Sequence, residues 1–448
     1  MALTRFAPSP TGLLHLGNLR VAVFNWALAR RDGGRFVLRI DDTDAARSEE
    51  RFVEAIREDL DWLGLTADEE ARQSDRLDRY AAAAEALKAA GRLYPCWETP
   101  EELEFRRKVQ RGQGRPPVYD RAALRLSEAE KADLSAERPP HWRFRLAPEP
   151  IEWTDGIEGE KRLDPAAVSD PVLIREDGQV LYTLASAVDD GEMGITDVVR
   201  GADHVTNTGA QIQIMQALGH RPPRFAHHSL VGDAEGRPFS KRDGTASLRA
   251  LREAGLEPMA AVSMAVRLGS ADDVEPFETP AQAAAAFDLA RFGRAPVKLD
   301  PARLWSLSAQ MLRARPFEAV AEALAARGVL GPRAAALWAA VSPNVERLDE
   351  VVEWDRVLRE GAQGAQAAPA EEDAAYVAQA LAALPPRPWG PETWGEWTGA
   401  LKAATGRKGR ALFQPLRRAL TGRDRGPEMA ALMPLIEADP RPAAPARD

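Results

Sequence analysis

The stretch TRFAPSPTGLLHLGNLRVAVFNWALARR, residues 4–31, decides the fold class, and the chain is organised around it. Its first apolar run breaks at Pro8 and Pro10, because proline does not occur inside a central strand. Apolar residues then recur at helical spacing from Asn18, which we expect to be the N-cap. A second apolar run, 35–40, predicts a strand that ends in the acidic segment 41–44. Strand, loop, helix and strand in this order predict a doubly wound sheet, whose ligands bind beyond the carboxyl ends of the strands.

The length and composition are those of a large soluble enzyme. At 448 residues the chain is expected to form about three domains. The start shows no signal-peptide pattern, and no apolar run approaches the roughly 18 residues that cross a bilayer, so we expect a cytoplasmic protein without a membrane partner. The single cysteine, Cys96, excludes an internal disulfide. The net charge of −9 argues against an indiscriminate polyanion binder but allows a nucleic-acid ligand on one basic face.

Further elements follow from periodicity and end signals. Residues 48–63 predict a helix with Ser48 as its N-cap, and 75–90 predict another. The second half of the sheet is expected to resume at 180–190, before a helix at 208–218.

His15 lies between Gly12 and Gly17, and a histidine in that setting is most often a turn residue. Its context is more specific. The string PSPTGLLHLG, residues 8–17, resembles the first signature of class I aminoacyl-tRNA synthetases, in the form of the glutamyl and glutaminyl branch.

A second segment, GRPFSKRDG at 236–244, resembles the other signature loop of this family, although Pro238 replaces its first lysine. Alone, such a segment is usually an exposed turn. Together the two resemblances imply that His15 and Lys241 are catalytic and stabilise charge on the phosphates of ATP, which binds with Mg²⁺. The ATP contacts that they imply are Pro8, Ser9, Pro10, Thr11, Gly12, His15, Gly17, Asn18, Phe239, Ser240, Lys241 and Arg242.

The passage DHVTNT at 203–208 resembles the glutamyl-tRNA synthetase family most distinctively. By position, the resemblance implies a glutamate pocket formed by Arg5, Ser9, Asp41, Tyr182, Ser186 and Arg200. Glutamate has two carboxylates, and a guanidinium binds a carboxylate with two charge-assisted hydrogen bonds, so Arg5 and Arg200 suit this substrate. The alternative is that Arg5 and Arg200 only pair with aspartates of nearby loops.

Residues 91–185 resemble the acceptor-stem-binding insertion of the family. Some members hold zinc there on three cysteines and a tyrosine, but here only Cys96 and Tyr119 match, and Glu98 replaces a second cysteine. Since tetrahedral zinc needs four ligands, we expect neither zinc nor another protein-bound metal. The resemblance also implies tRNA phosphate contacts from Arg106, Arg107 and Lys108, the alternative being a solvated charged face.

Beyond residue 245 helical patterns dominate. Residues 316–448 resemble the all-helical anticodon-binding domain of bacterial glutamyl enzymes, whereas glutaminyl relatives use β-barrels there. Trp389, Trp394 and Trp397 are expected in its core. The tRNA contacts implied in this domain are Asn344, near the position that reads the third anticodon base, and Arg407, Lys408, Arg410, Arg417 and Arg418.

These patterns predict an α/β fold: a Rossmann-type class I synthetase catalytic domain (1–90 and 186–245) split by the acceptor-binding insertion (91–185). A stem-contact helical region (246–315) and the all-α domain (316–448) follow. The expected activity is ATP-dependent ligation of L-glutamate to tRNA(Glu), with tRNA(Gln) as an open second acceptor, by a monomer. Three alternatives stay open: a relative that glutamylates a tRNA base, a nucleotidyltransferase of another class, and a catalytically silent tRNA-binding paralogue.

Overall fold

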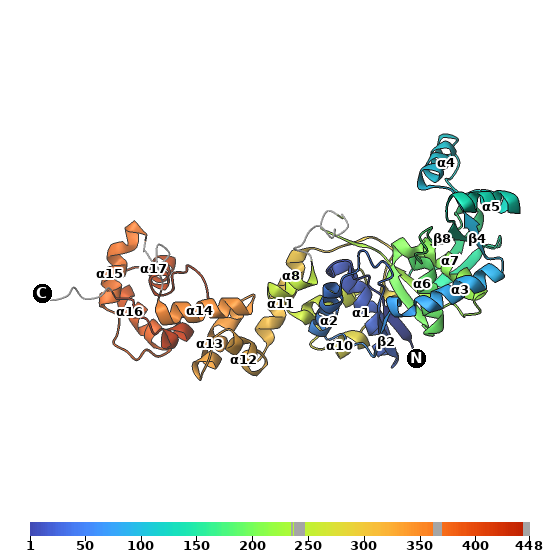
Figure 1. Cartoon of the computed structure of the whole chain (residues 1–448). Helices are drawn as coiled ribbons and strands as arrows, with labels where there is room; N and C mark the ends of the chain where they lie inside the picture. Colours follow the sequence, from blue (N-terminus) through green and yellow to red (C-terminus); the bar gives the residue numbers. More distant parts are fainter. Residues whose placement is uncertain (234–235, 237–246, 362–369, 442–448) are drawn as a thin grey trace. The chain divides into compact units, whose positions relative to one another are not determined.

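The structure is a computed structural model that describes residues 1–233, 236, 247–361 and 370–441 (Figure 1). Its contacts divide the chain into two compact units. The first comprises Met1–Ala254 with Pro258–Leu304, and the second comprises Gly255–Glu257 with Trp305–Asp448. No helix in the described ranges is both long enough and apolar enough to span a bilayer.

A parallel sheet forms the centre of the first unit. Its strands are β1 (Leu3–Phe6), β2 (Arg35–Ile40), β3 (Glu69–Arg72), β9 (Asp197–Gly201) and β10 (Arg224–His228). β2 pairs with β1 and β3, and β9 pairs with β10, all in parallel. The Thr196 N–H donates to the Leu3 carbonyl at 2.9 Å, which places β9 beside β1. The resulting order, β3-β2-β1-β9-β10, is that of a doubly wound fold and confirms the predicted class.

Helices cover this sheet. They are α1 (Leu16–Arg31), α2 (Glu50–Leu63), α3 (Leu77–Ala89), α6 (Tyr182–Glu192) and α7 (Val205–Ala217). α1 contacts β1, β2 and β9 on one side and α9 and α10 on the other, which explains why it is apolar on most of its surface.

Three expectations for these elements are wrong. α1 begins at Leu16 with His15 as its N-cap, and Asn18 is instead the third helical residue, whose side chain accepts from the His15 N–H. α2 begins at Glu50, and its N-cap Glu49, rather than Ser48, makes no side-chain cap. The segment expected to resume the sheet at 180–190 is helix α6, because a short apolar run that is buried on all sides has no distinguishing period.

The insertion adds antiparallel structure between α3 and α6. One sheet has the order β4 (Leu93–Cys96), β5 (His141–Phe144) and β8 (Val172–Ile174), and β6 (Ile151–Asp155) forms a hairpin with β7 (Gly159–Leu163). Two helices, α4 (Pro100–Gly112) and α5 (Glu128–Glu137), lie between β4 and β5 in the sequence. The Gly156 N–H donates to the Phe225 carbonyl at 2.8 Å, so the hairpin contacts β10 of the central sheet.

The remaining elements are mainly helical. The first unit continues with β11 (Val231–Gly232), α8 (Leu248–Glu253), α9 (Pro258–Arg267), α10 (Pro280–Ala285) and β12 (Val297–Lys298). The following helices are α11 (Pro301–Ala314), α12 (Phe317–Ala326), α13 (Arg333–Val341), α14 (Leu348–Glu360), α15 (Ala374–Ala382), α16 (Thr393–Thr405), α17 (Arg410–Thr421) and α18 (Met429–Leu432). In the described part of the second unit there is no strand, and Trp389 and Trp397 are buried in its core with Trp394 packed against it, as expected.

Candidate active site

The first signature loop connects β1 to α1 beyond the carboxyl end of β1. His15 caps the helix through its side chain, because Nδ1 accepts the Gly17 N–H at 3.0 Å. In a neutral imidazole this leaves the proton on Nε2. A Cβ on Gly17 would lie 2.8 Å from Cε1 of His15, so a glycine is needed for this ring position. A histidine held in this way lies where the helix dipole favours anions.

The second signature is bounded by described residues at both ends. Phe239, Ser240, Lys241 and Arg242 themselves lie outside the described residues. After the signature, Ser247 forms an antiparallel bridge with His15, and the Leu248 N–H donates to the Leu14 carbonyl at 2.8 Å. Ser247, the first described residue after the second signature, therefore lies beside the histidine of the first.

A buried cluster of charges lies behind this loop, at the carboxyl ends of β1 and β2. The guanidinium of Arg39, which is fully buried, donates to Asp41 at 2.7 and 3.1 Å, to Asp190 at 2.7 Å and to Ser186 Oγ at 3.2 Å. Burial opposes the charge on Arg39, but Asp41 and Asp190 raise its pKa. Sequence reasoning missed both Arg39 and Asp190, since the residues lie 151 positions apart and no local pattern connects them.

Asp41 and Ser186, which were predicted to line the pocket, thus accept hydrogen bonds from Arg39. Burial raises the pKa of Asp41 to about 6, although Arg39 opposes this shift. Arg5 donates from Nε to Asp190 at 3.1 Å, which agrees with the alternative that it pairs with an aspartate. Among the described residues only this nitrogen of Arg5 has a hydrogen-bond partner, so the outer edge of its guanidinium remains available for a ligand. Ser9 of the same pocket is exposed on the loop after β1.

Arg200 has a different environment from Arg5. Among the described residues its guanidinium donates hydrogen bonds to Tyr182 Oη at 3.0 Å, Thr208 Oγ1 at 2.6 Å, Gln211 Oε1 at 2.8 Å and His227 Nε2 at 3.3 Å, none of which is a carboxylate. It is 4% exposed, and burial lowers its pKa. Within the described ranges no carboxylate forms an ion pair with it, in contrast to the alternative reading.

Arg200 is therefore the arginine of this cluster that lacks a carboxylate partner among the described residues. Arg5 pairs with Asp190, and Arg39 pairs with Asp41, with Asp190 and, at 3.7 Å, with Asp189, which also pairs with Arg76. A buried charge without a partner is unfavourable, and a carboxylate ligand would neutralise it. The arrangement is suited to binding an acidic substrate.

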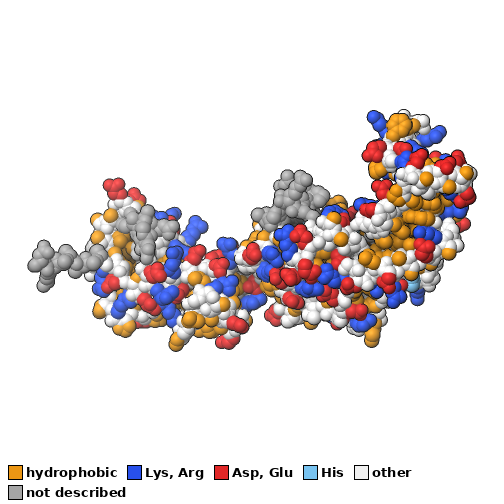
Figure 2. Space-filling model, viewed as in Figure 1, with side chains coloured by type: hydrophobic (Ala, Val, Ile, Leu, Met, Phe, Trp, Pro, Cys, Tyr) orange, Lys and Arg blue, Asp and Glu red, His pale blue; other side chains and the backbone are white. Residues whose placement is uncertain are grey.

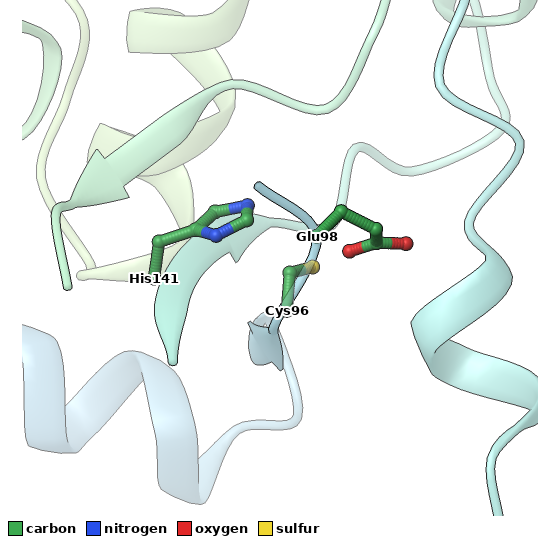
Figure 3. Close-up of side chains that lie close together, drawn as sticks. All are labelled: Cys96, Glu98 and His141. Carbon is green, nitrogen blue, oxygen red and sulfur yellow. The ribbon is translucent and has the colours of Figure 1, made fainter. Parts of the chain in front are cut away.

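In the insertion, Cys96, Glu98 and His141 bring three potential ligand atoms within 4.8 Å of one another (Figure 3). Sequence reasoning missed His141, which reaches the cluster from β5. However, Glu98 Oε1 already accepts from Tyr119 Oη at 2.8 Å and from Arg106 at 3.2 Å. Burial and then Arg143 lower the pKa of His141 to about 4. Two neighbouring guanidinium groups oppose a divalent cation, so the donor set does not fit zinc, and the absence of zinc stays a prediction.

The basic residues predicted to contact tRNA are exposed or partly exposed. None of the residues of α4 is buried, and Figure 2 shows charged side chains around an apolar patch there. Arg106 and Arg107 form ion pairs with Glu98 and Glu104, whereas Lys108 is exposed. In the second unit the corresponding residues are Asn344, Lys408 and Arg410, which are exposed, and Arg407, Arg417 and Arg418, which are half-buried. Their role in RNA binding stays a prediction.

Comparisons with known proteins assign the family. The family described as "tRNA synthetases class I (E and Q), catalytic domain" matches residues 1–305, and "Anticodon binding domain" matches residues 311–440. The chain is 56% identical over 435 residues to "Glutamate--tRNA ligase 1" of Cereibacter sphaeroides, covering 97% of this chain and 98% of that protein. It is 57% identical over 441 residues to "Glutamate--tRNA ligase 2" of Dinoroseobacter shibae, covering 98% and 100%. A solved glutamate tRNA ligase from Elizabethkingia meningosepticum in complex with its amino acid has a TM-score of 0.82 at 28% identity, covering 97% of this chain and 96% of that one. The chain therefore belongs to the glutamate–tRNA ligase family of the class I tRNA synthetases.

Proposed function

We propose that this protein activates L-glutamate with ATP and transfers it to the 3′-terminal adenosine of tRNA(Glu). The observation that carries the proposal is Arg200, a buried guanidinium with no carboxylate partner in the described structure, at the end of the sheet where His15 begins α1. Its partner would be one carboxylate of glutamate, and the outer edge of Arg5 would bind within the same pocket.

The reaction has two steps. An oxygen of the glutamate α-carboxylate attacks the α-phosphorus of Mg·ATP in line, and pyrophosphate leaves. A ribose hydroxyl of the terminal adenosine then attacks the acyl carbon, loses its proton, and AMP leaves. Neither step needs a protein nucleophile, so the protein contributes positioning and electrostatic stabilisation. His15, at the start of α1, and Lys241 would stabilise the phosphate charge.

The proposed pocket would also distinguish glutamate from glutamine. An arginine offers only donors, and the amide NH₂ of glutamine is a donor too. A buried mismatch of this kind gives discrimination of about 10⁴ or more. We expect glutamine to be a poor substrate.

The tRNA would bind to the basic residues of α4 and of the second unit. Phosphate contacts supply affinity without sequence information. We propose that Asn344, which is exposed in the short turn 342–344, contacts a base of the anticodon, with tRNA(Gln) as an open second acceptor. We expect a monomer in the bacterial cytoplasm.

The test is pyrophosphate exchange into ATP with purified full-length protein. Exchange that requires glutamate, is increased by tRNA(Glu) and is nearly absent with glutamine supports the proposal. No exchange despite measurable tRNA binding would favour the silent paralogue. Exchange followed by glutamate that nuclease digestion recovers on an internal nucleotide, instead of on the 3′-terminal adenosine, would favour the base-modifying relative.

A further inference from the structure

A second buried chain of hydrogen bonds leads from the insertion to Arg200. Asp155, the last residue of β6, is 3% exposed, and His227 of β10 is fully buried. Asp155 Oδ2 lies 2.5 Å from His227 Nδ1, and its Oδ1 accepts the N–H groups of His227, Ile157 and Glu158 at 3.0, 3.0 and 2.9 Å. On the other side of the ring, His227 Nε2 lies 3.3 Å from Arg200 Nε.

The hydrogen-bond directions determine the tautomer of His227. Arg200 can only donate, so Nε2 must accept, and the ring proton is on Nδ1, where it is donated to Asp155. Thr208 Oγ1, which accepts from Arg200 at 2.6 Å, lies 2.9 Å from the same Nε2 and can donate its proton to it.

The charges of the chain agree with this assignment. Burial opposes ionisation of Asp155, but hydrogen bonds from the His227 side chain and from backbone N–H groups lower its pKa to about 2. Burial lowers the pKa of His227, and Arg200 contributes in the same direction against Asp155. The resulting state is an anionic carboxylate, a neutral imidazole and a cationic guanidinium in series.

We propose that Asp155 is a positioning residue for glutamate binding: by holding the Nδ1–H tautomer of His227, it presents an acceptor to Arg200 and fixes the plane of the guanidinium. This inference rests on the proposed function, in which Arg200 binds a substrate carboxylate. Because Asp155 belongs to the insertion and Arg200 to the central sheet, the insertion would help to build the amino-acid pocket. The catalytic steps themselves need no direct contact with Asp155.

Asp155→Asn tests this tautomer control with minimal change in shape. The amide oxygen can keep the three backbone N–H bonds, which places the NH₂ group against Nδ1 of His227. Nδ1 must then accept, so the proton moves to Nε2 and faces the Nε–H of Arg200. We expect the KM for glutamate to rise about 10- to 100-fold, the range for losing one hydrogen bond to a charged group, while the KM for ATP changes less than about twofold.

His227→Gln provides a background in which the tautomer no longer matters. A glutamine can turn its amide oxygen toward Arg200 whatever stands at position 155. In this background Asp155→Asn should add little to the KM for glutamate, so the double variant is strongly non-additive. Additive effects would instead indicate that Asp155 acts structurally, and would overturn the inference.

Two controls separate the possible failures. Glu152→Gln removes one negative charge from the exposed part of β6, where Glu152 pairs with Arg162, and should leave both KM values unchanged. Arg200→Lys tests the underlying pocket: an unchanged KM for glutamate would contradict the proposed function itself. A raised KM in Arg200→Lys together with an unchanged KM in Asp155→Asn would overturn only the role of Asp155. Thermal unfolding of each variant checks that the fold is retained.

Discussion

Arg39 and Arg200 are both buried arginines, and the structure predicts opposite consequences for replacing them. Arg39 neutralises Asp41 and Asp190, which are buried. Arg39→Gln leaves these carboxylates without their principal partner, and the loss of one member of a buried ion pair costs about 3–5 kcal/mol. Arg200→Gln leaves no carboxylate unpaired, and it removes the cost of burying an uncompensated charge.

Replacing Arg200 should lower activity although it has little effect on stability. Four of the five N–H groups of Arg200 donate within the protein, so its proposed bond to glutamate is one charge-assisted hydrogen bond of about 1.5–3 kcal/mol. Arg200→Gln should therefore lower kcat/KM for glutamate by about 10- to 100-fold. The free energy of unfolding should change by less than about 2 kcal/mol, because the lost hydrogen bonds to neutral groups and the removed desolvation cost offset each other.

The assay pairs pyrophosphate exchange with urea unfolding of the full chain, followed through its first transition. The expected result is a stable Arg200→Gln with a reduced kcat/KM for glutamate, beside a destabilised Arg39→Gln. If Arg200→Gln unfolds as easily as Arg39→Gln and its folded fraction keeps the normal KM for glutamate, the guanidinium is structural and the pocket assignment is refuted.

Three further predictions concern other parts of the chain. Lys108→Gln on α4 should weaken tRNA binding and lower the magnitude of the slope of log K against log salt by about 1. The control is Lys131→Gln, whose lysine pairs with Glu128 and which should not change the slope. Equal slopes for both variants would exclude Lys108 from the tRNA interface. Elemental analysis of purified protein should find no stoichiometric zinc, because the guanidinium groups of Arg106 and Arg143 lie close to the Cys96, Glu98 and His141 cluster. One zinc per chain that is lost on Cys96→Ala would contradict this prediction. Burial raises the pKa of Asp59 from 3.8 to about 6, although Arg252 opposes this shift. The folded state therefore binds this proton more tightly than the unfolded state does. Because of this group, the free energy of unfolding should fall as the pH rises from about 4 to 6. Asp59→Asn should then stabilise the protein by up to about 3 kcal/mol at pH 8 and by little at pH 4, and equal effects in urea unfolding at both pH values would refute the shift.

The sequence was sufficient where a pattern is local. The strand 35–40 has the predicted bounds, because a run of apolar and β-forming residues between turn residues is a short-range signal. Helix ends were less predictable. His15 provides the cap although histidine is not a typical capping residue, and a glycine two positions later makes room for its ring.

The site was predictable only in part, for a physical reason. Arg5, Tyr182 and Arg200 were proposed for the pocket from their motifs, and the structure brings Tyr182 and Arg200 into contact. The groups around them come from distant elements: Asp190 of α6 accepts from both Arg5 and Arg39, and Asp155 of the insertion contacts His227, which accepts from Arg200. Pairing across 151 residues depends on the tertiary fold, which one sequence without an alignment does not reveal.

The bridge between His15 and Ser247 has a consequence for how the second signature can vary. β11, whose Val231 pairs with Val297, anchors the chain before the signature, and Ser247 anchors it afterwards. Because both ends are held in place, at the β11–β12 pair and beside α1, the number of residues between them is constrained more strictly than their identities. A substitution such as the proline at 238 changes one side chain, whereas an added or deleted residue would change the number of residues between the two anchors. Variation in this segment should therefore be dominated by replacements and nearly free of length changes.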